Sequence, residues 1–201
     1  AGLTVFHVVP SLDAALKAVD AGVDGLVVEG GEGGGFKNPQ DVSTMVLLPL
    51  IRSKVDVPII AAGGFIDGAS MAAAFALGAE AVQMGTRMVS AAESPVHENW
   101  KQAIINAKET DTVFLNRAHS PTLRALRTEK TTRLEFETEK NVMAEFGQAL
   151  ELYFGGDMEA SIALTGQVAG RIDSVRPVAD VIAEVKAEFF ATVSALSKQY
   201  L

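Results

Sequence analysis

Residues 57–87 read VPIIAAGGFIDGASMAAAFALGAEAVQMGTR, and this stretch decides the fold. It holds a short apolar run, VPIIA, then a glycine pair, an alanine-rich helical pattern and a second short run, AVQM. Continuous apolar strands that alternate with helices are typical of a parallel sheet that helices cover or that closes into a barrel. The stretch therefore predicts strands over 57–61 and 81–84 with a helix over 69–77 between them.

The same unit repeats in the residues that precede this stretch. We expect strands over 3–9 and 24–29, and helices over 12–21, which Ser11 caps, and over 42–53. Four strand-and-helix units are half of a (β/α)8 barrel, which in full typically needs about 250 residues. The sequence therefore predicts an α/β fold, the C-terminal half of a (β/α)8 TIM barrel.

The pattern changes to helices in the second half of the chain. Apolar spacing predicts helices over 95–107, 141–154 and 178–200. No linker rich in Pro or Ser separates these helices from the barrel part, so we expect them to be additions to one domain. We assign residues 1–125 to the half barrel and residues 126–201 to a helical C-terminal extension packed on it.

Composition excludes several classes of function. Of the 201 residues, 48% are hydrophobic and 21% are charged, with a formal net charge of −8. A negative net charge argues against a nucleic-acid partner, because phosphate backbones attract a basic face. The apolar runs are too short to span a bilayer, so we expect no membrane segment. The absence of cysteine excludes disulfides, metal–thiolate sites and thiol nucleophiles, and we expect no metal.

The first residues bear on the extent of the protein. The chain opens on Ala1 without an initiator Met, already inside a predicted strand. Natural chains usually place a few polar residues before the first core element, so we expect the natural protein to start earlier. No signal peptide is recognisable, which predicts a cytoplasmic protein.

Glycines cluster where the strands are predicted to end. They occupy most of 30–35 after the second strand, Gly63 and Gly64 after the third, and Gly85 after the fourth. Such ends form the active face of a barrel, where glycine lets the backbone N–H groups approach a ligand. The loops after the last two barrel strands commonly bind phosphate, so we predict a phosphorylated ligand near Gly64, Gly85 and Thr86. The alternative is that these glycines serve only tight strand-to-helix turns.

Three stretches resemble the nitronate monooxygenase (2-nitropropane dioxygenase) family, whose relatives include flavin-dependent enoyl-acyl-carrier-protein reductases. They are VDGLVVEGGEGGG at 23–35, the ungapped stretch at 57–101, and, more loosely, GQVAGRIDSVRPVADVI at 166–182. The resemblance implies an FMN-binding TIM barrel that acts on a small molecule. It also makes NAD(P)H a candidate reductant and a homodimer a candidate assembly.

The resemblance assigns roles to individual residues. The residues implied to bind the cofactor are Glu29, Gly34, Gly63, Gly64, Gln83, Met84, Gly85 and Thr86. Gly64 resembles the phosphate-contacting glycine of the family, and residues 83–86 (QMGT) resemble its phosphate clamp. Gly34 falls where the family has a glycine near the flavin, and Glu29 falls where many members have a flavin-contacting Gln.

One position departs from the family pattern. The family has Glu, a small residue, Gly, Gly and His, and this His removes the α-proton of a nitroalkane. Here Glu32 is followed by three glycines and then Phe36, which cannot accept a proton. A general base typically increases the rate by about 10² to 10⁴, so we expect slow reaction of neutral nitroalkanes. Nitronates are already deprotonated and do not need the base. Phe36 also suits an apolar acyl chain or a stacking contact with the flavin ring.

Three histidines remain as candidate bases. His119, in a loop that can fold over the strand ends, is the weak candidate for the missing catalytic group. His7 reads as a core or strand-end histidine, with a position facing the barrel interior as the alternative. His97 reads as a surface or structural residue.

Other charged residues have two interpretations each. Lys37 can bind an anionic substrate or be a solvated loop lysine. Arg117, Arg124 and Arg127 can bind the phosphate of a coenzyme A or phosphopantetheine group, or form local ion pairs with Glu129 and its neighbours. Asp67, in the loop after the glycine pair, is interpreted as a structural cap of the next helix.

Taken with the resemblance, these features lead to an FMN-dependent oxidoreductase that oxidises nitronates or nitroalkanes with O₂. The first alternative is a flavin-dependent enoyl-thioester reductase, which requires no nitroalkane base. The second is a barrel that binds FMN or another phosphorylated ligand without catalysis.

Overall fold

The computed structural model describes residues 2–201, and the chain divides into two compact units. The first unit comprises Ala1–Glu32, Asp41–Met84 and Ala179–Leu201, and the second comprises Gly33–Gln40 and Gly85–Val178. The assignment of residues 1–125 to a half barrel and of residues 126–201 to a helical extension stays a prediction.

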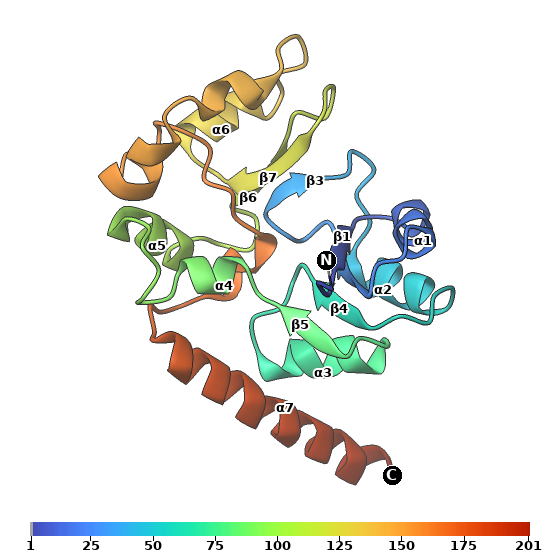
Figure 1. Cartoon of the computed structure of the whole chain (residues 1–201). Coiled ribbons are helices and arrows are strands. Elements are labelled where there is room, and N and C mark those ends of the chain that lie inside the picture. The colour runs from blue at the N-terminus through green and yellow to red at the C-terminus, as the bar shows by residue number, and fades with distance from the viewer. Residues whose placement is uncertain (1) are drawn as a thin grey trace. The chain divides into compact units, whose positions relative to one another are not determined.

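The first unit is built on a parallel sheet with the strand order β1-β2-β4-β5 (Figure 1). Its strands are β1 (Phe6–Val9), β2 (Gly25–Glu29), β4 (Ile59–Ala62) and β5 (Ala81–Gln83). The connecting helices are α1 (Leu12–Asp20), α2 (Thr44–Arg52) and α3 (Gly68–Ala76). Each lies within a few residues of its expected bounds. These elements confirm an α/β fold with a parallel sheet. The assignment of this sheet to half of a barrel stays a prediction.

Local signals explain where two of these helices begin. The hydroxyl of Ser11 accepts the N–H of Ala14, which caps α1 as predicted. The carboxylate of Asp67 accepts the N–H of Ser70, and the Ser70 hydroxyl accepts the N–H of Asp67 in return. This reciprocal capping box starts α3, so the interpretation of Asp67 as a structural cap is confirmed.

The core of the first unit lies between the sheet and its helices. β2 is buried from Gly25 to Val28, without any alternation between inner and outer faces. Ile59 of β4 and the α2 residues Leu48 and Ile51 have no exposed surface. Such burial is typical of a parallel strand that is covered on both faces.

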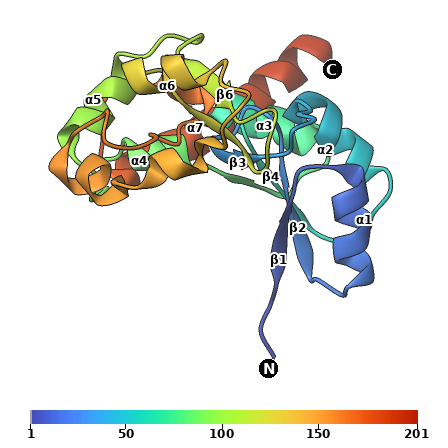
Figure 2. The ribbon, with the colours of Figure 1, turned by 90° about the horizontal axis from the view of Figure 1, so that it is seen from above.

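The edge strand β1 differs from the buried strand that the sequence predicts. β1 and β2 run side by side with α1 next to them (Figure 2). Phe6 and Val8 are 41% and 47% exposed, His7 is exposed as well, and only Val9 is buried. Among residues 2–201, only β2 pairs with β1. A core position for His7 is therefore wrong.

The long helix expected over 178–200 is α7 (Val178–Tyr200). α3 lies between α7 and the sheet (Figure 1). The rings of Phe75 and Phe189 meet edge to face with centroids 5.0 Å apart, and Glu188 accepts the N–H of Gly68 at 2.8 Å. A Cβ on Gly68 would collide with the backbone of α7, so the close approach of the two helices requires glycine there.

We expect Gly68→Ala to loosen α7 from α3. Overpacking costs about 1–3 kcal/mol, and the added methyl group meets backbone atoms that cannot rotate away. Gly147→Ala is the matched control, because its added Cβ meets a single atom within 4 Å, at 3.8 Å. Urea denaturation followed by circular dichroism measures the free energy of unfolding, and equal values for the two variants would contradict this expectation.

The second unit contains an antiparallel sheet with the strand order β3-β7-β6. Its strands are β3 (Gly35–Lys37), β6 (Thr112–Leu115) and β7 (Thr122–Leu126), and its helices are α4 (Thr86–Val89), α5 (Glu98–Ile105) and α6 (Glu129–Leu134). A turn at Asn116, with φ of 64°, lies between β6 and β7. Of the helices expected here, α5 is present within 95–107.

β6 and β7 correct the expectation that this half of the chain is all helical. Both strands are only four or five residues long. β6 reads TVFL, without alternation of apolar and polar residues, and the alternation in TLRAL of β7 is too short to identify a strand by itself. The helix expected over 141–154 is wrong too. Its place is taken by a 3₁₀ helix over Val142–Phe146 and a π-helical turn over Glu151–Gly155.

Candidate functional site

The carboxyl ends of three neighbouring strands meet at one edge of the sheet in the first unit. Glu29, at the end of β2, is in register with Ala62 at the end of β4. Ala62 is in turn in register with Gln83 at the end of β5. Gly63 and Gly64 follow Ala62 directly, so the sheet brings Glu29, the glycine pair and Gln83 to one edge.

The glycine pair has a backbone conformation that favours glycine. The φ angles of Gly63 and Gly64 are +84° and +92°. Within residues 2–201, the N–H groups of Gly64 and Phe65 donate to no protein acceptor. Successive N–H groups left free in this way form a concave site for an anion. We call Gly63, Gly64 and Phe65 the glycine loop.

Two polar side chains contact the glycine loop. The hydroxyl of Thr44, the first residue of α2, lies 2.9 Å from the carbonyl oxygen of Gly63 and 3.3 Å from that of Ala62. The carboxylate of Glu32 accepts the N–H of Thr44 at 3.0 Å and its hydroxyl at 2.9 Å. Ser43, at the N-cap, makes no side-chain bond, so Glu32 caps α2 instead. No sequence signal joins Glu32 to Thr44, which is why neither residue was predicted at the site.

Three of the predicted cofactor residues lie in the second unit. A Cβ on Gly85 would meet no atom within 4 Å, so the surroundings of this residue are open. Thr86 is 8% exposed, and its hydroxyl oxygen accepts the N–H of Gly166 at 2.9 Å. A Cβ on Gly34 would lie 2.6 Å from the backbone of Thr165 and Gly166. Packing alone therefore requires glycine at position 34. Gly166, which contacts both Gly34 and Thr86, lies in the stretch at 166–182 that resembles the family more loosely.

Phe36 presents an aromatic surface on β3. Phe36 is 57% exposed. Its ring stacks on that of Phe146, with a centroid distance of 6.4 Å and an angle of 24° between the ring planes. The next residue, Lys37, is only 8% exposed, so the interpretation as a solvated loop lysine is wrong. The position that the resemblance gives to a histidine thus carries an apolar ring in this chain.

Two histidines of the second unit have protein partners. Nδ1 of His97 accepts the N–H of Asn99 and caps α5, in agreement with a structural role. Nε2 of His119 lies 3.1 Å from the carbonyl oxygen of Thr138. A role for His119 as a base stays a prediction.

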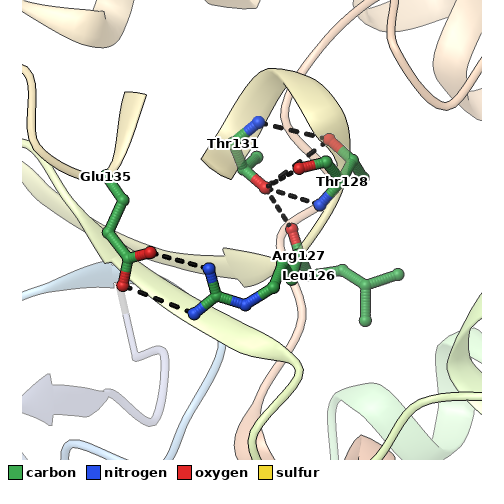
Figure 3. Close-up of polar contacts among 5 residues, drawn as sticks. All are labelled: Leu126, Arg127, Thr128, Thr131 and Glu135. Atoms are coloured by element: carbon green, nitrogen blue, oxygen red, sulfur yellow. Dashed lines mark hydrogen bonds and ion pairs between the residues drawn. The ribbon is translucent and has the colours of Figure 1, made fainter. Parts of the chain in front are cut away.

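Arg127 forms an ion pair close to the start of α6. Figure 3 shows its guanidinium facing the carboxylate of Glu135, with N–O distances of 2.7 and 3.4 Å. The hydrogen bond to Glu135 raises the pKa of Arg127 above its ordinary value. Next to this pair, Thr128 and Thr131 form the capping box that begins α6 (Figure 3). The local ion pair expected for Arg127 is present, with Glu135 as its partner.

The other two arginines of the predicted basic cluster share one aromatic ring. The guanidinium carbons of Arg117 and Arg124 lie 4.1 and 5.2 Å from the ring centroid of Phe114. Contacts of this kind are favourable because the ring face is electron-rich. Binding of a coenzyme phosphate by these arginines stays a prediction.

Within residues 2–201, no helix combines the length and the apolar character needed to cross a membrane. α7 is long enough, with 23 residues, but it is too polar. In the same part of the chain, no three His, Asp or Glu side chains gather in a way that could hold a metal ion.

Comparison with known proteins places this geometry in a family. The family model for nitronate monooxygenase matches residues 1–188. An octahydro-indene-carboxyl-CoA dehydrogenase of Rhodococcus jostii (strain RHA1) is 40% identical over 131 residues, which cover 64% of this chain and 36% of that protein. A probable nitronate monooxygenase of Staphylococcus aureus (strain JH9) is 41% identical over 121 residues, 56% of this chain and 34% of that protein.

Solved structures agree with the fold. FabK from Thermotoga maritima superimposes with a TM-score of 0.93 at 39% identity, covering 100% of this chain and 65% of FabK. A nitroalkane oxidase from Streptomyces ansochromogenes, at 22% identity and a TM-score of 0.82, shares the fold over 97% of this chain and 60% of its own. The chain thus spans about a third of the curated relatives and less than two thirds of these structures. On the match over residues 1–188, the chain belongs to the nitronate monooxygenase family.

Proposed function

We propose that this protein is an FMN-dependent oxidoreductase that oxidises nitronates with O₂. The observation that carries the proposal is the glycine loop at the carboxyl end of β4, with two N–H groups that have no protein acceptor within residues 2–201. Family membership supports the flavin, because the resembling stretches include this loop and residues 83–86.

The residues present fit the phosphate of FMN. In the first unit, the free N–H groups of Gly64 and Phe65 are suitable donors for a dianionic phosphate. The family resemblance also assigns Gly85 and Thr86 to the phosphate. In the second unit, Gly85 has open surroundings, and the hydroxyl oxygen of Thr86 accepts the N–H of Gly166. Bound FMN would supply electron transfer between the substrate and O₂. The chain would hold and orient it, with Glu29 and Gln83 at the same sheet edge as the glycine loop.

The choice of nitronates over neutral nitroalkanes rests on Phe36. A neutral nitroalkane must lose its α-proton to a base, and Phe36 has no atom that can accept a proton. A nitronate has already lost this proton, so it needs binding and orientation only.

The cofactor is tested by the visible absorption spectrum of the purified protein. We expect flavin bands, and we expect heat treatment to release FMN. Addition of a nitronate such as propionate 3-nitronate should then give O₂ consumption. A colourless protein that does not take up added FMN would contradict the proposal.

A second candidate function is the reduction of enoyl thioesters. The observation in its favour is the stacked pair of Phe36 and Phe146, which offers an apolar surface to an acyl chain. One relative is named as a dehydrogenase of a carboxyl-CoA compound, which is also a thioester. Oxidation of NAD(P)H that depends on an added enoyl thioester, without O₂ consumption on nitronates, would favour this function over the first.

We also propose that the sheet of the first unit is part of a (β/α)8 barrel. Four parallel strands joined by helices are the arrangement that half of such a barrel requires. An experimental structure with FMN bound would test both this assignment and the extension predicted for 126–201.

A further inference from the structure

We infer that Glu32 and Thr44 are positioning residues for the glycine loop, holding it in the orientation that binds the FMN phosphate. This inference rests on the proposed function and names residues that the family resemblance does not assign to the cofactor. It is carried by three distances from the Thr44 hydroxyl oxygen, to Glu32, Ala62 and Gly63, and by the planarity of the peptide bond.

The Thr44 hydroxyl controls the direction of the peptide between Gly63 and Gly64. Its oxygen lies 2.9 Å from the carbonyl oxygen of Gly63. That carbonyl and the N–H of Gly64 belong to one planar trans peptide and therefore point in opposite directions. When Thr44 draws the carbonyl toward α2, the N–H of Gly64 is turned away from α2 and stays free of protein acceptors within residues 2–201. Without this contact, two glycines with wide conformational freedom would let the peptide rotate.

Glu32 holds the hydroxyl in place. Its carboxylate accepts the N–H of Thr44 at 3.0 Å. The hydroxyl has a single hydrogen, which the Glu32 carboxylate and the Gly63 carbonyl share, since an oxygen of each lies 2.9 Å from the Thr44 hydroxyl oxygen. A carboxylate at the first turn of a helix is favoured there because the free N–H groups offset its charge. The stem of the same side chain passes Gly64, since a Cβ on that glycine would lie 3.7 Å from the Cβ of Glu32. Glu32 thus contacts both α2 and the glycine loop.

Gly30 leaves room for this arrangement. A Cβ at position 30 would collide with the hydroxyl and the backbone nitrogen of Thr44 and with the Glu32 carboxylate. The N–H of Gly30 also donates to the carbonyl of Ala62 at 3.2 Å, which is the second carbonyl that the Thr44 hydroxyl approaches. The end of β2, the start of α2 and the end of β4 are therefore joined at a single point.

The experiment measures dissociation constants for FMN and for riboflavin, which lacks the phosphate, by titration of flavin fluorescence. The ratio of the riboflavin constant to the FMN constant reports on the phosphate site alone. We expect Thr44→Val to lower this ratio about tenfold, the effect of roughly one hydrogen bond, with riboflavin affinity unchanged. Thr44→Ser, which keeps the hydroxyl, should retain the ratio. Ser11→Ala, which removes a helix cap in the same unit, should retain it as well.

The outcomes separate this inference from the proposed function. A Thr44→Val protein with the wild-type ratio, or with equal losses for both flavins, overturns the positioning role and leaves the FMN proposal standing. A wild-type protein that binds neither flavin overturns the proposed function and this inference with it. If Thr44→Val does not fold, Thr44→Ala, which also removes the hydroxyl, carries the same expectation, and an unchanged ratio in that variant overturns the inference.

Discussion

We expect the Phe36→His variant to oxidise neutral nitroalkanes about 10² to 10⁴ times faster than the wild-type protein, which is the usual contribution of a general base. In the alignment that the family resemblance predicts, Phe36 takes the position of the proton-accepting histidine. The residue is 57% exposed on β3, so an imidazole can be accommodated there without entering a packed core. The gain should be confined to substrates that still carry an α-proton.

Oxygen consumption with a nitroalkane and with its nitronate measures this effect. The nitronate rate should change little, because its proton is already gone. Phe36→Leu is the matched control, since it also removes the ring stacked on Phe146 but introduces no base. Equal nitroalkane rates for the histidine and leucine variants would contradict the alignment of Phe36 with the catalytic histidine.

We expect Trp100→Ala to destabilise the second unit by about 3–5 kcal/mol, the usual cost of removing a large aromatic side chain from a core. Trp100 is 1% exposed, and its ring meets that of Tyr153 edge to face with centroids 4.9 Å apart. Its indole N–H donates to the hydroxyl of Thr165 at 3.2 Å. Alanine would leave a cavity and remove both contacts.

Trp100→Phe separates the loss of volume from the loss of the hydrogen bond. The Thr165 hydroxyl keeps its own bond to the carbonyl of Ala163, at 3.0 Å, so the phenylalanine variant leaves no buried hydroxyl without a partner. We expect it to cost about 1 kcal/mol for the lost hydrogen bond, plus a smaller packing term. Urea denaturation followed by circular dichroism measures both variants, because the chain has a single tryptophan and fluorescence would be lost with it. An alanine variant no less stable than the phenylalanine variant would show that Trp100 does not fill this core.

The elements of the first unit could be predicted because their signals are local. Ser11 and Asp67 cap helices through residues three positions ahead, and the strands are short apolar runs bounded by glycine or polar residues. Such patterns are complete within ten or so residues of sequence, so no distant partner is needed to interpret them.

The second unit could not be predicted in the same way. β3 begins at the last residue of a glycine-rich run and becomes a strand only because it pairs with β7, some 85 residues further along. The Thr122 hydroxyl of β7 donates to the Lys37 carbonyl of β3. β6 and β7 are four and five residues long, too short for their apolar pattern to identify a strand. The pairing partner, not the local pattern, decides these elements.

Sequence patterns were sufficient to predict the strands and helices of the first unit, the glycines at its strand ends, and the family. The groups that contact the glycine loop, and the glycines that are required for packing, are visible only in the folded structure. Glu32 and Thr44 are joined by hydrogen bonds between a loop and a helix start, and Gly34 is required by the backbone of Thr165 and Gly166. Contacts between segments far apart in the chain depend on how close the folded backbone brings them, and that distance leaves no pattern in the sequence.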